Sequence, residues 1–401
     1  MPGRTVVATV RNVPLEHIRS LVRGASGFEW VGADLSPLRL PAWTRVEHAD
    51  RWIELWAAHT LGVRIVTRTA ATRIEVVATI TRMVPPDAVE PPFPASIVAT
   101  IDGEIVASVQ IEGGPVILAR PDRGWQFIDG PASVLILDLP PAGREREVTI
   151  WLPHNGHALL RSMRADRPLN PGAPDSRSRW VHHGSSVSQG LEATSPLGPW
   201  PQLAARALGL DLTNLAIAGN AQLDPFVART IAATPADIVT LKLGVNIVNV
   251  DSMRRRAFIP ALHGFLDLVR EGHPETPIVV ITPIVCPAVE DIPGPTRKLG
   301  DGRYHGTPRE TVAGDGTLTL GIVREIVRDV TDARSRTDEL LWAGDGLTLL
   351  GDADRAHLWD GLHPDQTGYS IMAERFVAQA RDPDTDIGRA FARVLTPPQI
   401  D

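Results

Sequence analysis

The chain has 401 residues, 43% of them hydrophobic, and its 40 basic and 47 acidic residues give a formal net charge of −7. This length exceeds the usual size of one domain and predicts two domains with separate cores. The charges are interspersed without a basic stripe, which argues against nucleic acid as a partner. Cys286 is the only cysteine, which excludes an intramolecular disulfide and a cysteine-rich zinc site.

The first residues, from Met1 to Arg4 and onward, lack the continuous apolar stretch of a signal peptide. No later segment has enough consecutive apolar residues to span a bilayer. We therefore expect a soluble cytoplasmic protein that has no membrane partner.

The first part of the chain, residues 1–165, shows short runs in which apolar and polar residues alternate, as is typical of strands. Clusters of proline, glycine and aspartate between these runs predict turns, and Asp102-Gly103 predicts a tight hairpin. The only helical pattern is a short one near residues 15–22. We therefore expect an all-β, antiparallel sandwich of jelly-roll type. The clearest predicted strands are 63–67, 73–78 and 148–152.

Residues 166–179 carry prolines and charges but few apolar groups, and this composition predicts a linker. In residues 180–401, apolar runs alternate with amphipathic segments, which predicts a three-layer α/β/α domain around a parallel sheet. The predicted strands are 180–183, 212–218, 238–243 and 278–284. Helices are predicted at 200–208, 258–272 and 318–333, and a last helix follows Pro364.

Polar residues that could carry chemistry follow the predicted strands. Ser186, Gly219 and Asn246 come after three successive strands, and Asp360 and His363 precede the last predicted helix. Because the carboxyl ends of parallel strands meet at one edge of a sheet, we expect these residues to lie close together. A serine hydroxyl becomes a good nucleophile when an imidazole takes its proton, and a carboxylate fixes the tautomer of that imidazole. The pattern predicts a serine nucleophile with its base.

The order Gly-x-Ser, Gly, Gly-x-Asn and Asp-x-x-His resembles that of the SGNH hydrolases, the GDSL esterase and lipase superfamily. The resemblance implies that Ser186 is the nucleophile, His363 the base and Asp360 the partner that orients it. It also implies an oxyanion hole formed by the backbone N–H of Ser186, the backbone N–H of Gly219 and the side-chain amide of Asn246.

The resemblance covers about residues 180–380, and the sequence departs from the family pattern at two positions. Ser185 stands where the family usually has an aspartate before the nucleophile, and Ile247 stands where an aspartate usually follows the asparagine. Neither position performs the attack or the proton transfer. We therefore expect altered hydrogen bonding in these loops rather than loss of activity.

Several neighbouring residues have competing interpretations. Ser185 and Ser188 are rival nucleophiles, although both are expected to cap the helix that follows. Because Ser188 occupies the last position, the Gly-x-Ser-x-Gly elbow of α/β-hydrolases is not matched. His182 and His183 project to opposite faces of a strand, so they cannot readily hold one metal ion and are expected to be structural or pocket-lining. The loop 294–316 could cap the acyl pocket or be disordered surface.

These features together predict a serine esterase that hydrolyses a small-molecule carboxylic ester through an acyl-serine and needs no metal or organic cofactor. A β-sandwich joined to such a domain also resembles the two-domain carbohydrate esterases, which implies an acetyl or other small acyl ester on a sugar, glycoside or natural product. Two alternatives stay open. One is an acyltransferase that uses the same acyl-serine, and the other is a non-catalytic carbohydrate-binding protein.

Overall fold

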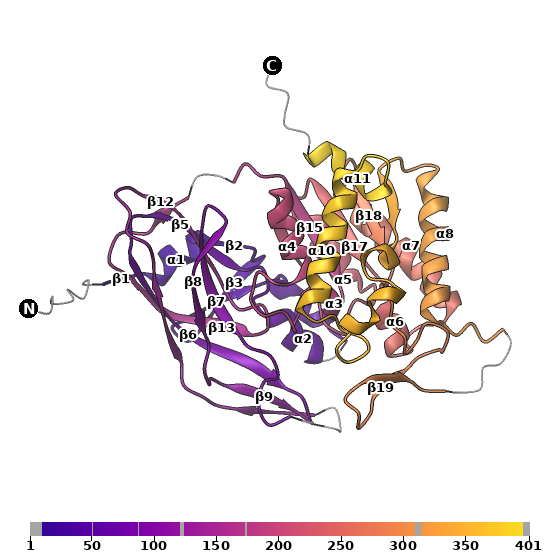
Figure 1. The fold of residues 1–401 in the computed structure, drawn as a ribbon, viewed down its shortest axis with the longest axis horizontal. Coiled ribbons are helices and arrows are strands. Elements are labelled where there is room, and N and C mark those ends of the chain that lie inside the picture. Colours follow the sequence, from indigo (N-terminus) through magenta and orange to yellow (C-terminus); the bar gives the residue numbers. More distant parts are fainter. Residues whose placement is uncertain are drawn as a thin grey trace, which may run out of the picture. The chain divides into compact units, whose positions relative to one another are not determined.

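A computed structural model of the protein describes residues 10–49, 51–86, 88–120, 124–172, 175–308 and 314–395 (Figure 1). Met1 to Arg4 and residues 309–313 of the predicted loop lie outside this part of the chain. Contacts within the chain divide it into two compact units. The first comprises Met1–Ala42, Ala57–Asp175 and Thr194–Leu197, and the second comprises Trp43–Trp56, Ser176–Ala193 and Gly198–Asp401. The domain boundaries at 165 and 180 stay a prediction.

The first unit is built from β-strands and the short helix α1 (Leu15–Leu21). Its described residues form two sheets. The first sheet contains β1 (Arg11–Val13), β3 (Gly27–Val31), β4 (Asp34–Leu38), β6 (Arg73–Val84), β9 (Val116–Ala119), β10 (Trp125–Ile128), β11 (Ser133–Asp138) and β13 (His157–Ala165). The second contains β2 (Val22–Arg23), β5 (Arg64–Thr69), β7 (Ser96–Ile101), β8 (Glu104–Gln110), β12 (Arg146–Trp151) and β14 (Asn170–Pro171).

Side chains from both sheets share one hydrophobic core, which makes this unit a sandwich, as predicted. Val76 and Leu160 from the first sheet and Ile65 and Val148 from the second are all buried in it. Burial of such aliphatic side chains stabilises a fold by about 1.5–3 kcal/mol each. The core is therefore the main source of stability in this unit.

Strand direction in the sandwich departs from the prediction at one place. The pairings are antiparallel as expected except that β6 and β9 run parallel, with Arg82 opposite Val116. The reason is the hairpin β7–β8, which lies between them in sequence and belongs to the other sheet. The hairpin turn is the predicted one, because Asp102 and Gly103 both have positive φ angles, as a two-residue turn of this kind requires.

The second unit contains a parallel sheet, which the described residues build in the spatial order β16-β15-β17-β18-β21. Their bounds are β15 (Arg179–Gly184), β16 (Asp211–Asn214), β17 (Ile238–Lys242), β18 (Ile278–Ile281) and β21 (Leu341–Gly344). Four of these strands were predicted. The predictions of 212–218 and 278–284 were too long, because the chain leaves the sheet at Asn214 and Ile281 and forms the loops that follow.

Helices cover both faces of this sheet (Figure 1). The longer ones are α4 (Trp200–Leu208), α5 (Pro225–Ala233), α7 (Arg255–Gly272), α8 (Leu320–Ser335), α10 (Gln366–Arg381) and α11 (Asp386–Leu395). The shorter helices of this unit are α3 (Ser186–Gln189), α6 (Val245–Asn249), α9 (Gly346–Leu349) and the 3₁₀ helix η2 (Asp352–His357). The 3₁₀ helix η1 (Ala42–Glu47) and α2 (Arg51–Ala58) lie in and around the segment Trp43–Trp56, which joins this unit from within the first part of the chain. The prediction that the helix after Pro364 is the last was wrong, because α11 follows α10. Among the described residues, no helix combines the length and apolar character needed to cross a membrane.

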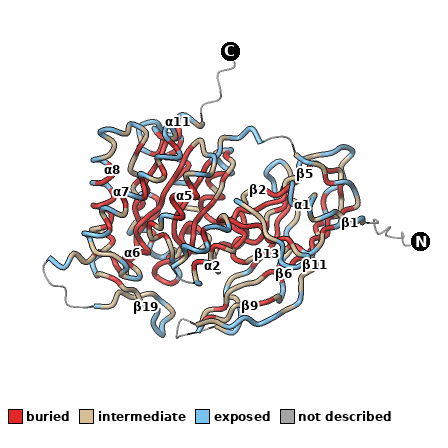
Figure 2. The backbone as a smooth tube through the Cα atoms, turned by 180° about the vertical axis from the view of Figure 1, so that it is seen from behind, coloured by how far each residue is buried: buried red, intermediate tan, exposed pale blue. Residues whose placement is uncertain are grey.

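Strand β15 shows how the two faces are separated. Trp180 is fully buried on one face and stacks on Phe376 of α10, with ring centroids 5.3 Å apart. His183 contacts Phe265 of α7 on the other face, with centroids 6.1 Å apart. Aromatic pairs of this kind contribute about 0.5–1.5 kcal/mol beyond the area they bury. Helices on both faces leave the central strands β17 and β18 buried throughout, and much of the tube in this unit is red in Figure 2.

Candidate active site

The predicted site residues all follow strands at the carboxyl edge of the parallel sheet or lie on the loop before α10. Ser186 is the first residue of α3, directly after β15, and Asn246 lies in α6, directly after β17. Gly219 lies in the loop after β16, and Asp360 and His363 lie between η2 and α10. The parallel register of β15, β16 and β17 brings the first three of these segments to the same edge, and the hydrogen bond between Ser186 and His363 shows that the loop before α10 reaches it.

Ser186 is held in place by the turn that joins β15 to α3. The Oγ of Ser185 accepts a hydrogen bond from the N–H of Val187 and caps the helix, as expected for this residue. Gly184 is required by close packing, since a Cβ at this position would lie 2.6 Å from the Oγ of Ser188. The turn is therefore tightly specified, and it leaves Ser186 only 6% exposed.

A chain of hydrogen bonds joins the hydroxyl, the imidazole and the carboxylate. The Oγ of Ser186 lies 2.9 Å from Nε2 of His363, and Nδ1 of His363 lies 2.7 Å from Oδ2 of Asp360. Because a carboxylate only accepts hydrogen bonds, the proton of the neutral imidazole resides on Nδ1. Nε2 is then free to accept the proton of the serine hydroxyl, as a general base must.

The loop that carries this pair is fixed by the other oxygen of Asp360. Its Oδ1 accepts hydrogen bonds from the backbone N–H groups of Leu362 (3.0 Å) and His363 (2.7 Å). Burial alone would raise the pKa of Asp360, but the hydrogen bonds from His363 and these backbone groups outweigh it and hold the pKa below its ordinary value. Asp360 is therefore an ionised, almost completely buried carboxylate.

A second carboxylate, Glu192, faces the same imidazole and was missed by sequence reasoning. Its Oε1 lies 3.9 Å from Nδ1 of His363, and its side chain is 6% exposed. Burial would lower the pKa of His363, but the charges of Glu192 and Asp360 outweigh it and raise the pKa. The sequence offered only a weak signal: Glu192 is the first acidic residue after Ser186.

The groups proposed for the oxyanion hole are available as donors. The Oδ1 of Asn246 accepts a hydrogen bond from the N–H of Ala221 (3.0 Å), which orients the amide and ties α6 to the loop of Gly219. Gly219 has a φ of 71°, a conformation that favours glycine. In the described part of the chain, neither the N–H of Ser186, nor that of Gly219, nor Nδ2 of Asn246 has a hydrogen-bond partner.

The rival serine, Ser188, has an imidazole of its own. Its Oγ lies 2.8 Å from Nε2 of His182, whose Nδ1 lies 2.6 Å from the hydroxyl of Thr240. All three residues are fully buried, and Trp200 packs edge-on against the imidazole. Ser188 therefore does not cap α3 as expected but anchors it to the sheet. Burial also keeps the pKa of His182 well below its ordinary value, so this imidazole stays neutral.

The other histidine and the two departures from the family pattern are structural. His183 is on the opposite face of β15 from His182, and its Nδ1 lies 2.9 Å from the carbonyl oxygen of Leu215. Ser185 caps α3, and Ile247 is buried. The described residues contain no group of three or more acidic, histidine or cysteine side chains that could hold a metal ion.

Part of the loop 294–316 lies against the histidine. It folds as the hairpin β19 (Thr296–Lys298) and β20 (Tyr304–Gly306). The N–H of Tyr304 donates to the carbonyl oxygen of Asp360 (2.8 Å), and its ring packs edge-on against the imidazole of His363 with centroids 5.8 Å apart. The hairpin part of the loop therefore packs against the imidazole of His363, and its role as a cap on the acyl pocket stays a prediction.

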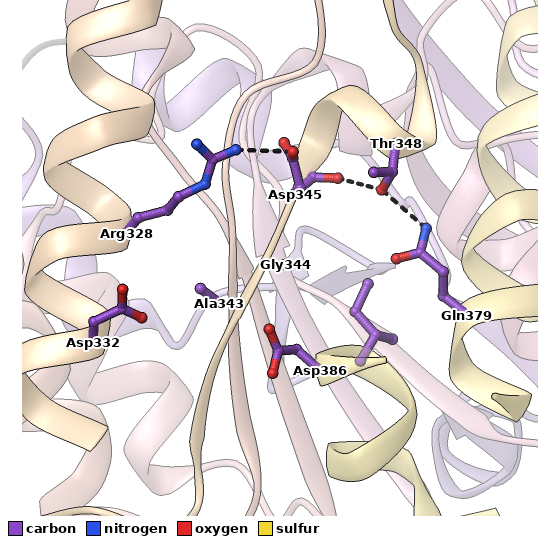
Figure 3. A pocket seen from close by; sticks show the side chains of 9 residues that line it. Arg328, Asp332, Ala343, Gly344, Asp345, Thr348, Gln379 and Asp386 are labelled. Carbon is purple, nitrogen blue, oxygen red and sulfur yellow. Dashed lines mark hydrogen bonds and ion pairs between the residues drawn. The ribbon is translucent and has the colours of Figure 1, made fainter. Parts of the chain in front are cut away.

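A separate hollow of about 300 Å³ lies beside β21, between α8, α10 and α11 (Figure 3). Arg328 pairs there with Asp345, and Gln379 donates to the hydroxyl of Thr348. None of the predicted site residues lines it. Its lining includes neither a serine nor a histidine, so it cannot host the chemistry described above.

Residues 183–371 match the family described as GDSL-like lipase/acylhydrolase. This span contains every predicted site residue, from Ser186 to His363. No curated protein sequence matches the chain.

Among solved structures, the chain is similar to the salicylyl-acyltransferase SsfX3 from a tetracycline biosynthetic pathway. The identity is 26%, the TM-score 0.73, and the match covers 94% of this chain and 96% of that one. It is also similar to a proposed GDSL-like lipase from Bacteroides ovatus (19% identity, TM-score 0.65, 93% and 97% covered). A family two carbohydrate esterase from Clostridium thermocellum, solved with cellohexaose, shares the fold at 15% identity (TM-score 0.54, 80% and 93% covered).

Proposed function

We propose that this chain, which carries a domain of the GDSL-like lipase and acylhydrolase family at residues 183–371, is a serine esterase that forms an acyl-enzyme on Ser186. The observation that carries the proposal is the hydrogen-bond chain from Ser186 through His363 to Asp360, at 2.9 and 2.7 Å. A serine, an imidazole and a buried carboxylate in this order are the groups that acyl transfer needs. The proposed roles are nucleophile, general base and orienting carboxylate.

In the first step, the Oγ of Ser186 attacks the ester carbonyl carbon while Nε2 of His363 accepts the hydroxyl proton. The negative charge on the carbonyl oxygen is stabilised by the N–H groups of Ser186 and Gly219 and by Nδ2 of Asn246. The carbon–oxygen bond to the alcohol then breaks, and His363 returns its proton to the departing alkoxide. Asp360 stabilises the positive charge that the imidazole carries between these events.

In the second step, water replaces the alcohol. His363 takes a proton from the water, whose oxygen attacks the acyl carbon of the acyl-Ser186 ester. The same donors hold the second oxyanion, and the proton passes to the Oγ of Ser186 as the acid leaves. Every proton and electron pair is accounted for by these side chains and water.

The substrate in this proposal is a small-molecule ester with an acetyl or other short acyl group. A sugar, a glycoside or a natural product supplies the alcohol. The pairing of a β-sandwich unit with a parallel α/β unit supports this class, because the family two carbohydrate esterase from Clostridium thermocellum has a similar fold.

A second candidate is acyl transfer to an alcohol or amine in place of water. The similarity to a salicylyl-acyltransferase over 94% of this chain favours it. The acyl-serine step is the same for both reactions, so the acceptor decides between them. Incubating the enzyme with p-nitrophenyl acetate and added alcohols distinguishes the two. An esterase yields acetate at an unchanged rate, whereas a transferase yields the new ester in preference to acetate.

Replacement of Ser186 by alanine is expected to abolish turnover of p-nitrophenyl acetate, because no other hydroxyl of the described residues forms a hydrogen bond with His363. Ser188→Ala is the control, since that hydroxyl bonds His182 in the core. The Ser188 variant should lose about 1–3 kcal/mol of stability but keep turnover while folded. Unchanged turnover in Ser186→Ala, measured alongside circular dichroism of both variants, would move the nucleophile elsewhere.

Loss of the Asn246 donor is expected to lower kcat about 10²–10³-fold, or roughly 2.7–4 kcal/mol of transition-state stabilisation. Asn246→Asp is the sharper variant, because it keeps an oxygen for the N–H of Ala221 while it removes the donor and adds a negative charge beside the oxyanion, so its loss of kcat should be at least as large. Asn246→Ala removes both. If Asn246→Asp retains full kcat while Asn246→Ala does not, the side chain supports the loop and the assignment to the oxyanion hole is wrong.

A further inference from the structure

Glu192 and His363 form a contact that the proposed three-residue mechanism does not use. Glu192 lies six positions after Ser186, just beyond α3. Its Oε1 is 3.9 Å from Nδ1 of His363, the same nitrogen that bonds Asp360 at 2.7 Å. A separation of 3.9 Å is too long for a hydrogen bond and short enough for an ion pair. The imidazole therefore faces two carboxylates through one nitrogen.

A hydrogen bond from a second buried group, Tyr369, holds the side chain of Glu192 in position. The hydroxyl of Tyr369, on α10, donates to Oε2 of Glu192 at 2.6 Å. Tyr369 is fully buried. This hydrogen bond fixes one carboxylate oxygen and directs the other towards His363. A carboxylate held this way in the interior needs a nearby positive charge, and the imidazolium formed during acyl transfer supplies it.

We propose that Glu192 is a positioning residue that stabilises the protonated form of His363. When Asp360 is replaced, Glu192 accepts the hydrogen bond from Nδ1–H in its place. The inference rests on the esterase proposal above and adds a fourth residue to it. Glu192 does not touch the reacting atoms and acts through the imidazole.

The groups that the described residues place around His363 come from several elements. Asp360 comes from the same loop, Glu192 from the segment after α3, Tyr369 from α10 and Tyr304 and Lys298 from the hairpin β19–β20. Burial and the charge of Lys298 act to lower the pKa of His363, and the two carboxylates act to raise it. The pKa of Glu192 is itself raised, chiefly by burial. The net effect is a histidine whose pKa lies above its ordinary value.

The direction in which the pH profile should move follows from the proposed role of His363 as the base. His363 accepts a proton only when it is neutral, so the acid limb of the pH profile of kcat/KM follows its pKa. Glu192→Gln keeps the size of the side chain and an acceptor for Tyr369 but removes the charge. An opposite charge within about 4–6 Å shifts a pKa by about 1–3 pH units. We therefore expect the acid limb to move down by about one pH unit or more.

Tyr369→Phe is the matched structural control. It removes the hydrogen bond at 2.6 Å but leaves the Glu192 carboxylate in the protein. If Glu192 only helped to hold α10, both variants would lose stability and neither would move the pH profile. We expect Glu192→Gln to move the profile most. Tyr369→Phe should move it in the same direction by a smaller amount, because the carboxylate stays in the protein but loses the hydrogen bond that directs it. Equal acid limbs in the wild type and Glu192→Gln would overturn the proposal.

A double-mutant comparison tests whether Glu192 can replace Asp360 as the acceptor for Nδ1–H. Loss of the aspartate from a serine-protease triad lowers kcat about 10⁴-fold. With Glu192 present, Asp360→Asn should cost less than this, because Nδ1–H can turn to Glu192. The full loss should appear only in Asp360→Asn combined with Glu192→Gln. If the two losses simply multiply, Glu192 does not replace Asp360 and this part is wrong.

Failure of this inference can be told apart from failure of the esterase proposal. The pKa of His363 can be measured by NMR titration of its ring proton, which needs no substrate. A lower pKa in Glu192→Gln than in the wild type supports the inference even if no ester is hydrolysed. Normal hydrolysis with an unchanged His363 titration contradicts the inference and leaves the esterase proposal intact.

Discussion

One proton, on Nδ1 of His363, decides how the rest of the site can work. Asp360 accepts it at 2.7 Å and is itself held by two backbone N–H groups of the same loop. With this proton fixed, Nε2 is left as an acceptor facing the hydroxyl of Ser186. If Nδ1 were unprotonated, Nε2 would carry the proton and could not act as a base. The parallel sheet matters to function because it holds the turn of Ser186 at the edge that the loop before α10 reaches.

Two serine–histidine pairs begin on the same strand-to-helix turn, and their surroundings give them different properties. Ser188 and His182 are 2.8 Å apart, as close as Ser186 and His363 at 2.9 Å. The other nitrogen of His182 forms a hydrogen bond with a hydroxyl, and the rings of Trp180 and Trp200 pack against the imidazole, so these contacts offer no negative charge to balance a positive one. His363 meets a carboxylate. A neutral core imidazole anchors α3, while the imidazole beside the carboxylate can be protonated and deprotonated in turn.

Motif order predicted which residues meet at the sheet edge, because parallel strands place their following loops together whatever their separation in sequence. Strong apolar runs likewise predicted β17 and β18. Glu192 could not be found this way, because its role depends on the side chain of Tyr369, 177 residues away, and no local pattern encodes that contact. Strand β21 is a short edge strand, and α11 is an amphipathic helix beyond the last motif, so neither carried a clear signal. The sequence also contains no signal that Trp43–Trp56 belong to the second unit.

The central claim is that the hydroxyl of Ser186 is the activated nucleophile of this chain. A fluorophosphonate reacts with such a hydroxyl and leaves a covalent adduct, which peptide mass spectrometry can locate. The account predicts a single adduct on Ser186 whose formation slows sharply when His363 is replaced by alanine. An adduct on Ser185 or Ser188, or no adduct on a folded protein, would contradict it.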